Sequence, residues 1–292
     1  MWRGASFRFA FVLIVSLILV APYSWAERGI SNSGWSMFRS THFVFYYRPG
    51  IPKRFLYKMK RYAERYYRRI VQDLGLLRTN YWVWDERCRV YIYANKEDYL
   101  RSVKTLPEWS EGGAIPERRE IHCYYHEDNE RLFRTVLPHE MTHLLFYEAR
   151  KGMRIPHAID EGVAMREEED KSRVLGSYYV VTNALQNKKY IPVYRLLDWQ
   201  SEYVKMDNET AQLFYAESCL LLDFLLTEFP KNFFANFCWR MRSGSDFYKA
   251  FRLSYPRYSA YGKINVDKLE EEFWQYVRRT NPFSASDWVA TQ

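Results

Sequence analysis

Cysteine is scarce in this sequence, which contains only four in 292 residues. None has the short spacing of a zinc finger, so the sequence disfavours a metal site built from thiolates. Four cysteines allow three disulfide pairings, and Cys88 with Cys123 is favoured because both fall on strands expected to be neighbours. Consecutive helices in the second half would pair Cys219 with Cys238. Four buried free thiols are an equally good alternative.

Long apolar runs are also missing, apart from one of about a dozen residues near the N-terminus. That run, residues 9–20, follows Arg3 and Arg8 and precedes a small-x-small site that ends at Ala26. This order is typical of an export signal that is cut after Ala26. Because about 20 apolar residues are needed to span a bilayer, an uncleaved anchor is the less favoured alternative. We therefore expect an exported, periplasmic or extracellular protein with no stable membrane span after cleavage.

No internal repeat, low-complexity segment or long linker is visible in the rest of the chain. Apolar residues make up 48% of the sequence, which is enough for a large core and argues against disorder. The net charge of +8 is spread along the chain, so solubility explains it better than a polyanionic partner does. Nothing identifies a nucleic-acid-binding fold, and we expect no such partner.

Residues 139–143 spell HExxH inside a stretch with helical patterning. Because four residues make slightly more than one helical turn, His139 and His143 project from one face and can bind one metal ion. Imidazole nitrogens at this spacing suit zinc, and two of them with one further protein ligand leave a fourth position open for water, as in catalytic sites. Glu140 lies beside them, where it can take a proton from that water. The sequence therefore predicts a catalytic zinc site.

Glu161 is the natural third ligand, 18 positions after His143. That distance is enough to end the first helix, turn at Gly152 and Pro156, and return a second helix whose first turn faces the metal. HExxH alone is a modest signal, but HExxH followed by a Glu-Gly pair at this spacing is much stronger. We therefore expect one Zn²⁺ ion held by His139, His143 and Glu161.

The strings HExTH and P-x-x-x-x-E-G-x-A together resemble the gluzincin metallopeptidases, most closely the bacterial peptidase MA-like group. Residues 40–47 resemble that group's opening strand, and residues 215–222 resemble its helix after the site. The resemblance implies a peptide or protein substrate and a substrate-binding edge strand near residues 111–116. It also implies a tyrosine that donates to the oxyanion, for which Tyr215 is the candidate. Core packing explains Tyr215 almost as well, because the chain has 25 tyrosines.

Three positions depart from the pattern of this group. Ala158 stands where the group usually has Trp. Pro138 precedes the first ligand, where it removes one helix hydrogen bond. Met165 stands where thermolysin-type members have a carboxylate that orients a ligand histidine, so the resemblance does not supply partners for the two histidine rings. Among the other histidines, His157 is the one placed to contribute, because it precedes Glu161 by four residues.

The pattern of apolar residues predicts an α+β fold, with a mixed sheet in an N-terminal lobe and mostly helices in a C-terminal lobe. The resemblance places zinc between the lobes, as in a zincin-like fold. We expect a signal peptide at 1–26 and a peptidase MA-like domain at 27–292, with a strand-rich lobe at 27–128 and a helical lobe at 129–292. Strands are expected at 41–47, 89–94 and 120–125, and helices at 52–74, from 129 through the HExxH motif, and at 208–226, 233–241 and 266–279.

The function expected from the sequence is that of an exported zinc metallopeptidase of the gluzincin type, with Glu140 as general base and then general acid. The alternative is a noncatalytic zinc-binding or pseudoenzyme envelope protein that binds peptide or an anionic polymer. An intact Glu140 beside both histidines favours the enzyme, because a decayed site has no chemical need for that carboxylate. The pattern leaves the substrate preference and the oligomeric state open.

Overall fold

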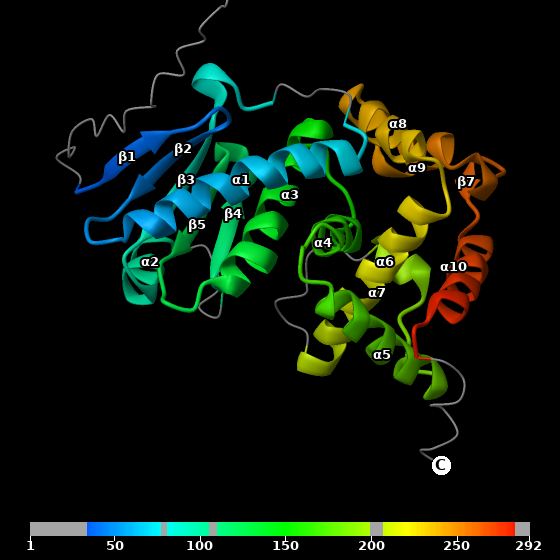
Figure 1. Cartoon of the computed structure of the whole chain (residues 1–292). Coiled ribbons are helices and arrows are strands. Elements are labelled where there is room, and N and C mark those ends of the chain that lie inside the picture. The colour runs from blue at the N-terminus through cyan, green and yellow to red at the C-terminus, as the bar shows by residue number, and fades with distance from the viewer. Residues whose placement is uncertain (1–33, 77–80, 105–109, 199–206, 284–292) are drawn as a thin grey trace, which may run out of the picture.

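The computed structural model describes residues 34–76, 81–104, 110–198 and 207–283. The predicted export signal, residues 1–26, lies outside these ranges. Within them, no helix combines the length and the apolar character required to cross a membrane. Figure 1 shows a sheet with two long helices against it and a group of further helices beside them.

Five strands form one mixed sheet: β1 (Ser36–Arg39), β2 (Phe43–Tyr47), β3 (Cys88–Tyr93), β4 (Gly112–Ile115) and β5 (Glu120–Tyr124). Their order in the sheet is β1-β2-β3-β5-β4. The inner strands β2, β3 and β5 run parallel, and the outer strands β1 and β4 are antiparallel to their neighbours. In the described part of the chain β4 pairs with β5 alone, so one row of its backbone N–H and C=O groups faces outward.

One face of the sheet is apolar because buried side chains alternate along the inner strands. Phe43, Phe45 and Val90, for example, are fully buried. Two helices cover this face, α1 (Lys53–Asp73) and α3 (Leu137–Ala149), and both contribute side chains to the same core (Figure 1). This packing holds the helix that carries the HExxH motif along the sheet.

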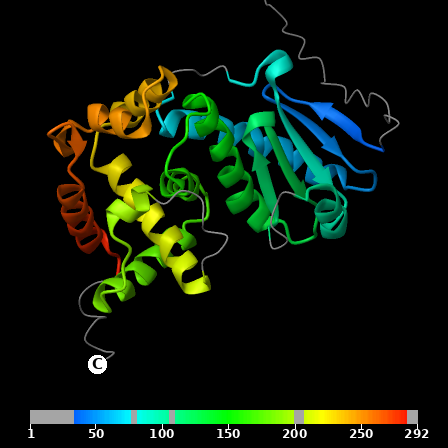
Figure 2. The same ribbon diagram turned by 180° about the vertical axis from the view of Figure 1, so that it is seen from behind.

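The other face of the sheet carries a short helix, α2 (Lys96–Ser102), at one end (Figure 2). The ring of Tyr99 packs against those of Tyr93 and Tyr124, with centroids 5.8 and 5.5 Å apart. The helix begins at Asn95, whose side chain accepts a hydrogen bond from the backbone N–H of Asp98.

Helices dominate the chain after α3, and Figures 1 and 2 both show α4 beside α7 at their centre. α7 is apolar on most of its surface and buries 11 of its residues, as expected for a helix surrounded by others. The elements are α4 (His157–Arg166), α5 (Ser172–Gln186), α6 (Val193–Asp198), α7 (Asn208–Thr227), α8 (Lys231–Arg242), α9 (Phe247–Ser254), α10 (Val266–Thr280) and a hairpin of β6 (Ser259–Ala260) and β7 (Lys263–Ile264).

The predicted α+β class is confirmed, with a mixed sheet first and mostly helices after it. The expected strands correspond to β2, β3 and β5, and the expected helices include α1, α3, α7, α8 and α10. The sequence does not predict β1 or the β6–β7 hairpin. These strands have four and two residues, too few to show a period of two.

The predicted disulfides are wrong, and the alternative of four buried free thiols is what the structure has. Cys123 on β5 is in register with Ile92 on β3, so Cys88 lies four residues away along β3. That offset is about 13 Å at ~3.3 Å per residue, far beyond the reach of a disulfide. Burial also raises the pKa of Cys123, Cys219 and Cys238 to about 12, which makes these thiols poor nucleophiles.

Candidate metal centre and catalytic cleft

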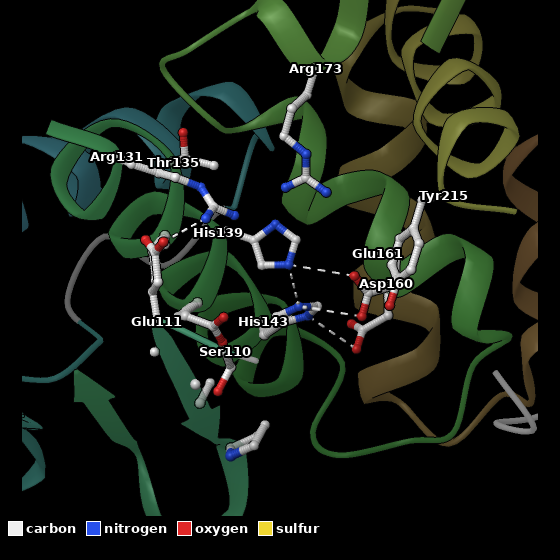
Figure 3. Close-up of a pocket in the computed structure, with 16 residues that line it drawn as sticks. Ser110, Glu111, Arg131, Thr135, His139, His143, Asp160, Glu161, Arg173 and Tyr215 are labelled. Atoms are coloured by element: carbon white, nitrogen blue, oxygen red, sulfur yellow. Dashed lines mark hydrogen bonds and ion pairs between the residues drawn. The ribbon is translucent and has the colours of Figure 1, made fainter. Parts of the chain in front are cut away.

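The structure brings the three predicted ligands, His139, His143 and Glu161, to one point (Figure 3). The Nε2 atom of His139 lies 3.2 Å from Nε2 of His143 and 3.4 Å from Oε2 of Glu161. The Nε2 atom of His143 lies 3.7 Å from Oε1 of Glu161. The histidines come from adjacent turns of α3 and the glutamate comes from α4, so two packed helices build the group.

Glu161 is held in place because the next residue is glycine. A Cβ atom at Gly162 would overlap the backbone carbonyl oxygen of Ser218 on α7, so only glycine lets α4 approach α7 this closely. The chain turns between α3 and α4 at Lys151 and Gly152, which both have positive φ. In the Glu-Gly pair, Glu161 is therefore the ligand, and Gly162 allows the close contact between α4 and α7 that positions it.

Pro138 has no backbone N–H, so the carbonyl of Arg134, four residues earlier, lacks its helix hydrogen bond and accepts other hydrogen bonds instead. The turn before α3 is a π-helix, Leu132–Val136, and it contains the residue whose carbonyl the proline leaves without a helix donor. That carbonyl, of Arg134, accepts hydrogen bonds from the backbone N–H groups of Glu169 (2.8 Å) and Asp170 (3.2 Å). The segment after α4 is thereby tied to the start of the HExxH helix.

Glu168, in this tied segment, is the partner of the first ligand histidine. Its Oε1 atom lies 2.9 Å from Nδ1 of His139, and its side chain is fully buried. Arg173 donates to the same oxygen at 2.6 Å and compensates the buried charge. The contact orients the His139 ring so that Nε2 faces Glu161. Glu168 thus orients a ligand histidine, the role that thermolysin-type members give to a carboxylate at the position of Met165.

Asp160 faces the second ligand histidine through an ion-pair contact rather than a hydrogen bond. Its Oδ2 atom lies 3.3 Å from Nδ1 of His143, and the guanidinium of Arg150 lies 3.7 Å from its other oxygen. His157, the histidine to be checked for a supporting role, lies 3.5 Å from Oε1 of Glu161. His139 therefore has a hydrogen-bonded partner that limits its orientation, whereas His143 and Glu161 have ion-pair contacts.

The electrostatics of the group favour a bound cation. Burial alone would lower the pKa of His139, but hydrogen bonds with Glu161 and Glu168 outweigh burial and raise that pKa to about 10. Burial would raise the pKa of Glu161, but the charge of His143 and the hydrogen bond with His139 lower it to about 2. Glu161 is therefore an anionic ligand at neutral pH, and a metal ion would compete with protons for the imidazoles.

A cavity of about 360 Å³ opens onto the three ligands and forms the candidate catalytic cleft. Glu140 lines it from α3, one position from the first ligand. Tyr215 lines it from α7 and projects beside Glu161 (Figure 3). The ring of Tyr215 also packs edge-to-face on Phe214, with centroids 5.7 Å apart. The position of Tyr215 is therefore compatible with both expected roles, as a donor to the cleft and as a packing residue.

The strand β4 borders this cleft, where the resemblance implied an edge strand. A Cβ atom at Gly112 would lie 2.8 Å from Cγ1 of Val136 and 3.0 Å from the carbonyl oxygen of His122. Only glycine therefore lets β4 approach the start of the HExxH helix. Gly112, Gly113 and Ala114 of β4 thus line the same cleft as the three ligands.

A family model of the peptidase MA superfamily matches residues 83–277, which contain the HExxH motif, Glu161 and Tyr215. The match covers more than half of the 292 residues. The chain belongs to the peptidase MA superfamily. This membership confirms the resemblance drawn from the HExTH and E-G-x-A strings and makes the chain a peptidase-family protein of a metal-dependent type. A comparison with curated proteins finds no match.

Three supporting residues of this peptidase MA member were missed by sequence reasoning: Asp160, Glu168 and Arg173. Asp160 could have been suspected because it adjoins Glu161. Glu168 lies in an acidic run, residues 167–170, and such a run usually indicates a solvated segment. Its burial depends on the backbone contact with Arg134, which no local pattern signals.

Proposed function

We propose that this peptidase MA member is an exported zinc metallopeptidase of the gluzincin type. The supporting observation is the spacing of the ligand atoms of His139, His143 and Glu161. Tetrahedral zinc with bonds of about 2.0–2.1 Å places neighbouring ligand atoms about 3.3 Å apart. The two Nε2 atoms lie 3.2 Å apart, which agrees with that value, and they lie 3.4 and 3.7 Å from Oε2 and Oε1 of Glu161, respectively. Two imidazoles and one carboxylate also suit a catalytic zinc ion.

The residues of the cleft would have separate chemical roles in peptide-bond hydrolysis. Bound zinc would supply a Lewis acid for the reaction. Glu140 is outside the ligand group, so its carboxylate is left to accept the proton of the attacking water and pass it to the departing amine. Tyr215 faces the cleft from α7, where its phenol can donate a hydrogen bond to the developing oxyanion.

The substrate proposed for this cleft is an extended peptide. Its backbone would pair with β4 as a sixth strand, which aligns it by main-chain hydrogen bonds irrespective of sequence. A noncatalytic peptide-binding protein of the envelope would use the same edge, so the edge alone does not favour the enzyme. Glu140, positioned in the cleft without a ligand role, does. The export part of the proposal rests on the pattern of residues 1–26.

Digestion of a mixed peptide library by the purified protein without residues 1–26 tests this proposal. We expect cleavage that a chelator abolishes and that about one equivalent of zinc restores. His139→Ala, which removes one ligand, should lose both the metal and the activity. A library left intact by the wild-type protein with zinc bound would contradict the proposed function.

A further inference from the structure

A second cavity, of about 510 Å³, lies beyond the C-terminal end of β4. The catalytic cleft, by contrast, already begins at Gly112, the N-terminal end of this strand. The second cavity is formed by the turn that follows β4, Pro116–Arg118, by the C-terminal end of α3, and by Arg242 of α8. Pro116 lines both this cavity and the catalytic cleft. The two cavities are therefore neighbours along the exposed edge of the sheet.

The second cavity is basic, because five cationic side chains and only two carboxylates line it. Two of the cations are paired within the protein, Arg89 with Glu120 at 3.0 Å and Arg119 with Glu148. Among the described residues, the other three have no carboxylate within ion-pair distance. These three, which we call the basic triad, are Arg118, Lys151 and Arg242.

The position of the basic triad relative to the ligands follows from the geometry of α3 and β4. His143 and Tyr147 are spaced by four residues on one side of α3, and Lys151 follows in the turn after the helix ends at Ala149. Six residues of helix from His143 to Ala149 cover about 9 Å, and the four steps from Gly112 to Pro116 cover about 13 Å of strand. An extended peptide along β4 spans such a distance with about three to four residues.

We propose that the basic triad is a specificity site that binds an Asp or Glu side chain of the substrate, about three to four residues from the scissile bond. This proposal rests on the proposed peptidase function and adds a substrate class to it, peptides with an acidic residue at that position. The guanidinium of Arg118 can bind a carboxylate with two parallel hydrogen bonds, and Lys151 adds a point charge. Both side chains are exposed, so an incoming carboxylate can reach them.

Arg242 also has a structural contact, since it donates a hydrogen bond of 2.8 Å to the backbone carbonyl of Glu148 at the end of α3. It is therefore unsuitable for a clean test. Arg118 and Lys151 are suitable, because neither makes an ion pair within the described residues. Lys151 has a φ of 55°, so Lys151→Asn is a suitable neutral substitution, because asparagine keeps a polar side chain and tolerates this left-handed backbone.

A set of neutral decapeptides tests the site through kcat/KM. One Glu is moved through the positions on both sides of the scissile bond, and each peptide is compared with its Gln counterpart. We expect one position, on one side, where Glu raises kcat/KM by about tenfold, an advantage that falls at high salt. Arg118→Glu combined with Lys151→Asn should abolish this advantage and leave the Gln peptides unchanged. Lys263→Glu, in the β6–β7 hairpin, reverses a charge outside this cavity and serves as a control that should keep the advantage.

Binding separates a failure of this site from a failure of the proposed function. Fluorescence anisotropy of labelled Glu and Gln peptides measures recognition without hydrolysis. Preferential binding of Glu peptides that the Arg118 and Lys151 substitutions remove would support the site, even if neither peptide were cleaved and the peptidase function failed. Equal cleavage and equal binding of the Glu and Gln peptides would overturn the site while leaving the peptidase function intact.

Discussion

Glu168→Ala is the most informative change outside the three ligands, because Glu168 orients His139 through a buried hydrogen bond of 2.9 Å. The substitution leaves Nδ1 of the ring without this partner and allows the ring to rotate away from Glu161. Loss of such a partner typically lowers metal affinity by about 10–100-fold, which corresponds to about 1.4–2.7 kcal/mol. We expect a value near the upper limit, because the lost acceptor is charged and fully buried. Glu168→Gln retains an acceptor and should lose about tenfold.

Competition with a chromophoric zinc chelator at neutral pH measures the zinc Kd of these variants. Glu169→Ala is the matched control: it removes the same charge from the next residue, whose carboxylate contacts Arg65 and Tyr66 of α1 rather than the site. This control should bind zinc as the wild type does. Thermal unfolding of the chelator-treated proteins checks that each variant folds. A Kd for Glu168→Ala within about twofold of the wild-type value, in a folded protein, would refute the reasoning.

Three further predictions concern stability and the state of the cysteines. The raised pKa of His139 contributes stability to the metal-free protein below pH 6.5 that is lost as the pH rises toward about 10. The lowered pKa of Glu161 contributes stability above pH 4.5 that is lost as the pH falls toward about 2. The two effects together predict that urea unfolding of chelator-treated protein requires most urea between pH 4.5 and 6.5. Gly162→Ala should destabilise the fold by about 1–3 kcal/mol because the new methyl group overlaps Ser218. Gly176→Ala, in open space on α5, should stabilise the fold by about 0.5–1 kcal/mol. Denaturant melts that showed equal effects of the two substitutions would contradict this prediction. The four cysteines should react with a thiol reagent only after unfolding, and a disulfide found in unreduced protein by mass spectrometry would contradict their assignment as free thiols.

The ligand group is the part of the site that the sequence predicts most directly, because its geometry is local. Four residues of helix bring His139 and His143 to one face, and a single turn returns Glu161 to them. The ligands' supporting partners are not local. Glu168 reaches His139 from the segment after α4, whose backbone is hydrogen-bonded to the carbonyl of Arg134, four residues before Pro138. No periodicity in the sequence reports such a contact.

The errors in the fold have a similar origin. The alternation of apolar residues predicts β3 and β5 and even their proximity, but it does not give their register. The register places Cys123 opposite Ile92 rather than Cys88, which excludes the expected disulfide. The edge strand β4 was implied by the resemblance alone, because the Gly-rich segment at 111–116 has no alternation of apolar residues that predicts a strand.

Glu140 is proposed to perform the chemistry beside a metal ion that it does not bind, and one measurement tests this directly. Zinc content and peptide-library cleavage are compared for the wild-type protein and Glu140→Gln, which keeps the shape of the side chain but cannot accept the proton of the attacking water. We expect about one zinc per chain in both proteins and a loss of turnover of about 10²–10⁴-fold or more in the variant. Equal cleavage by the two proteins, or no cleavage by wild-type protein that contains zinc, would contradict this proposal.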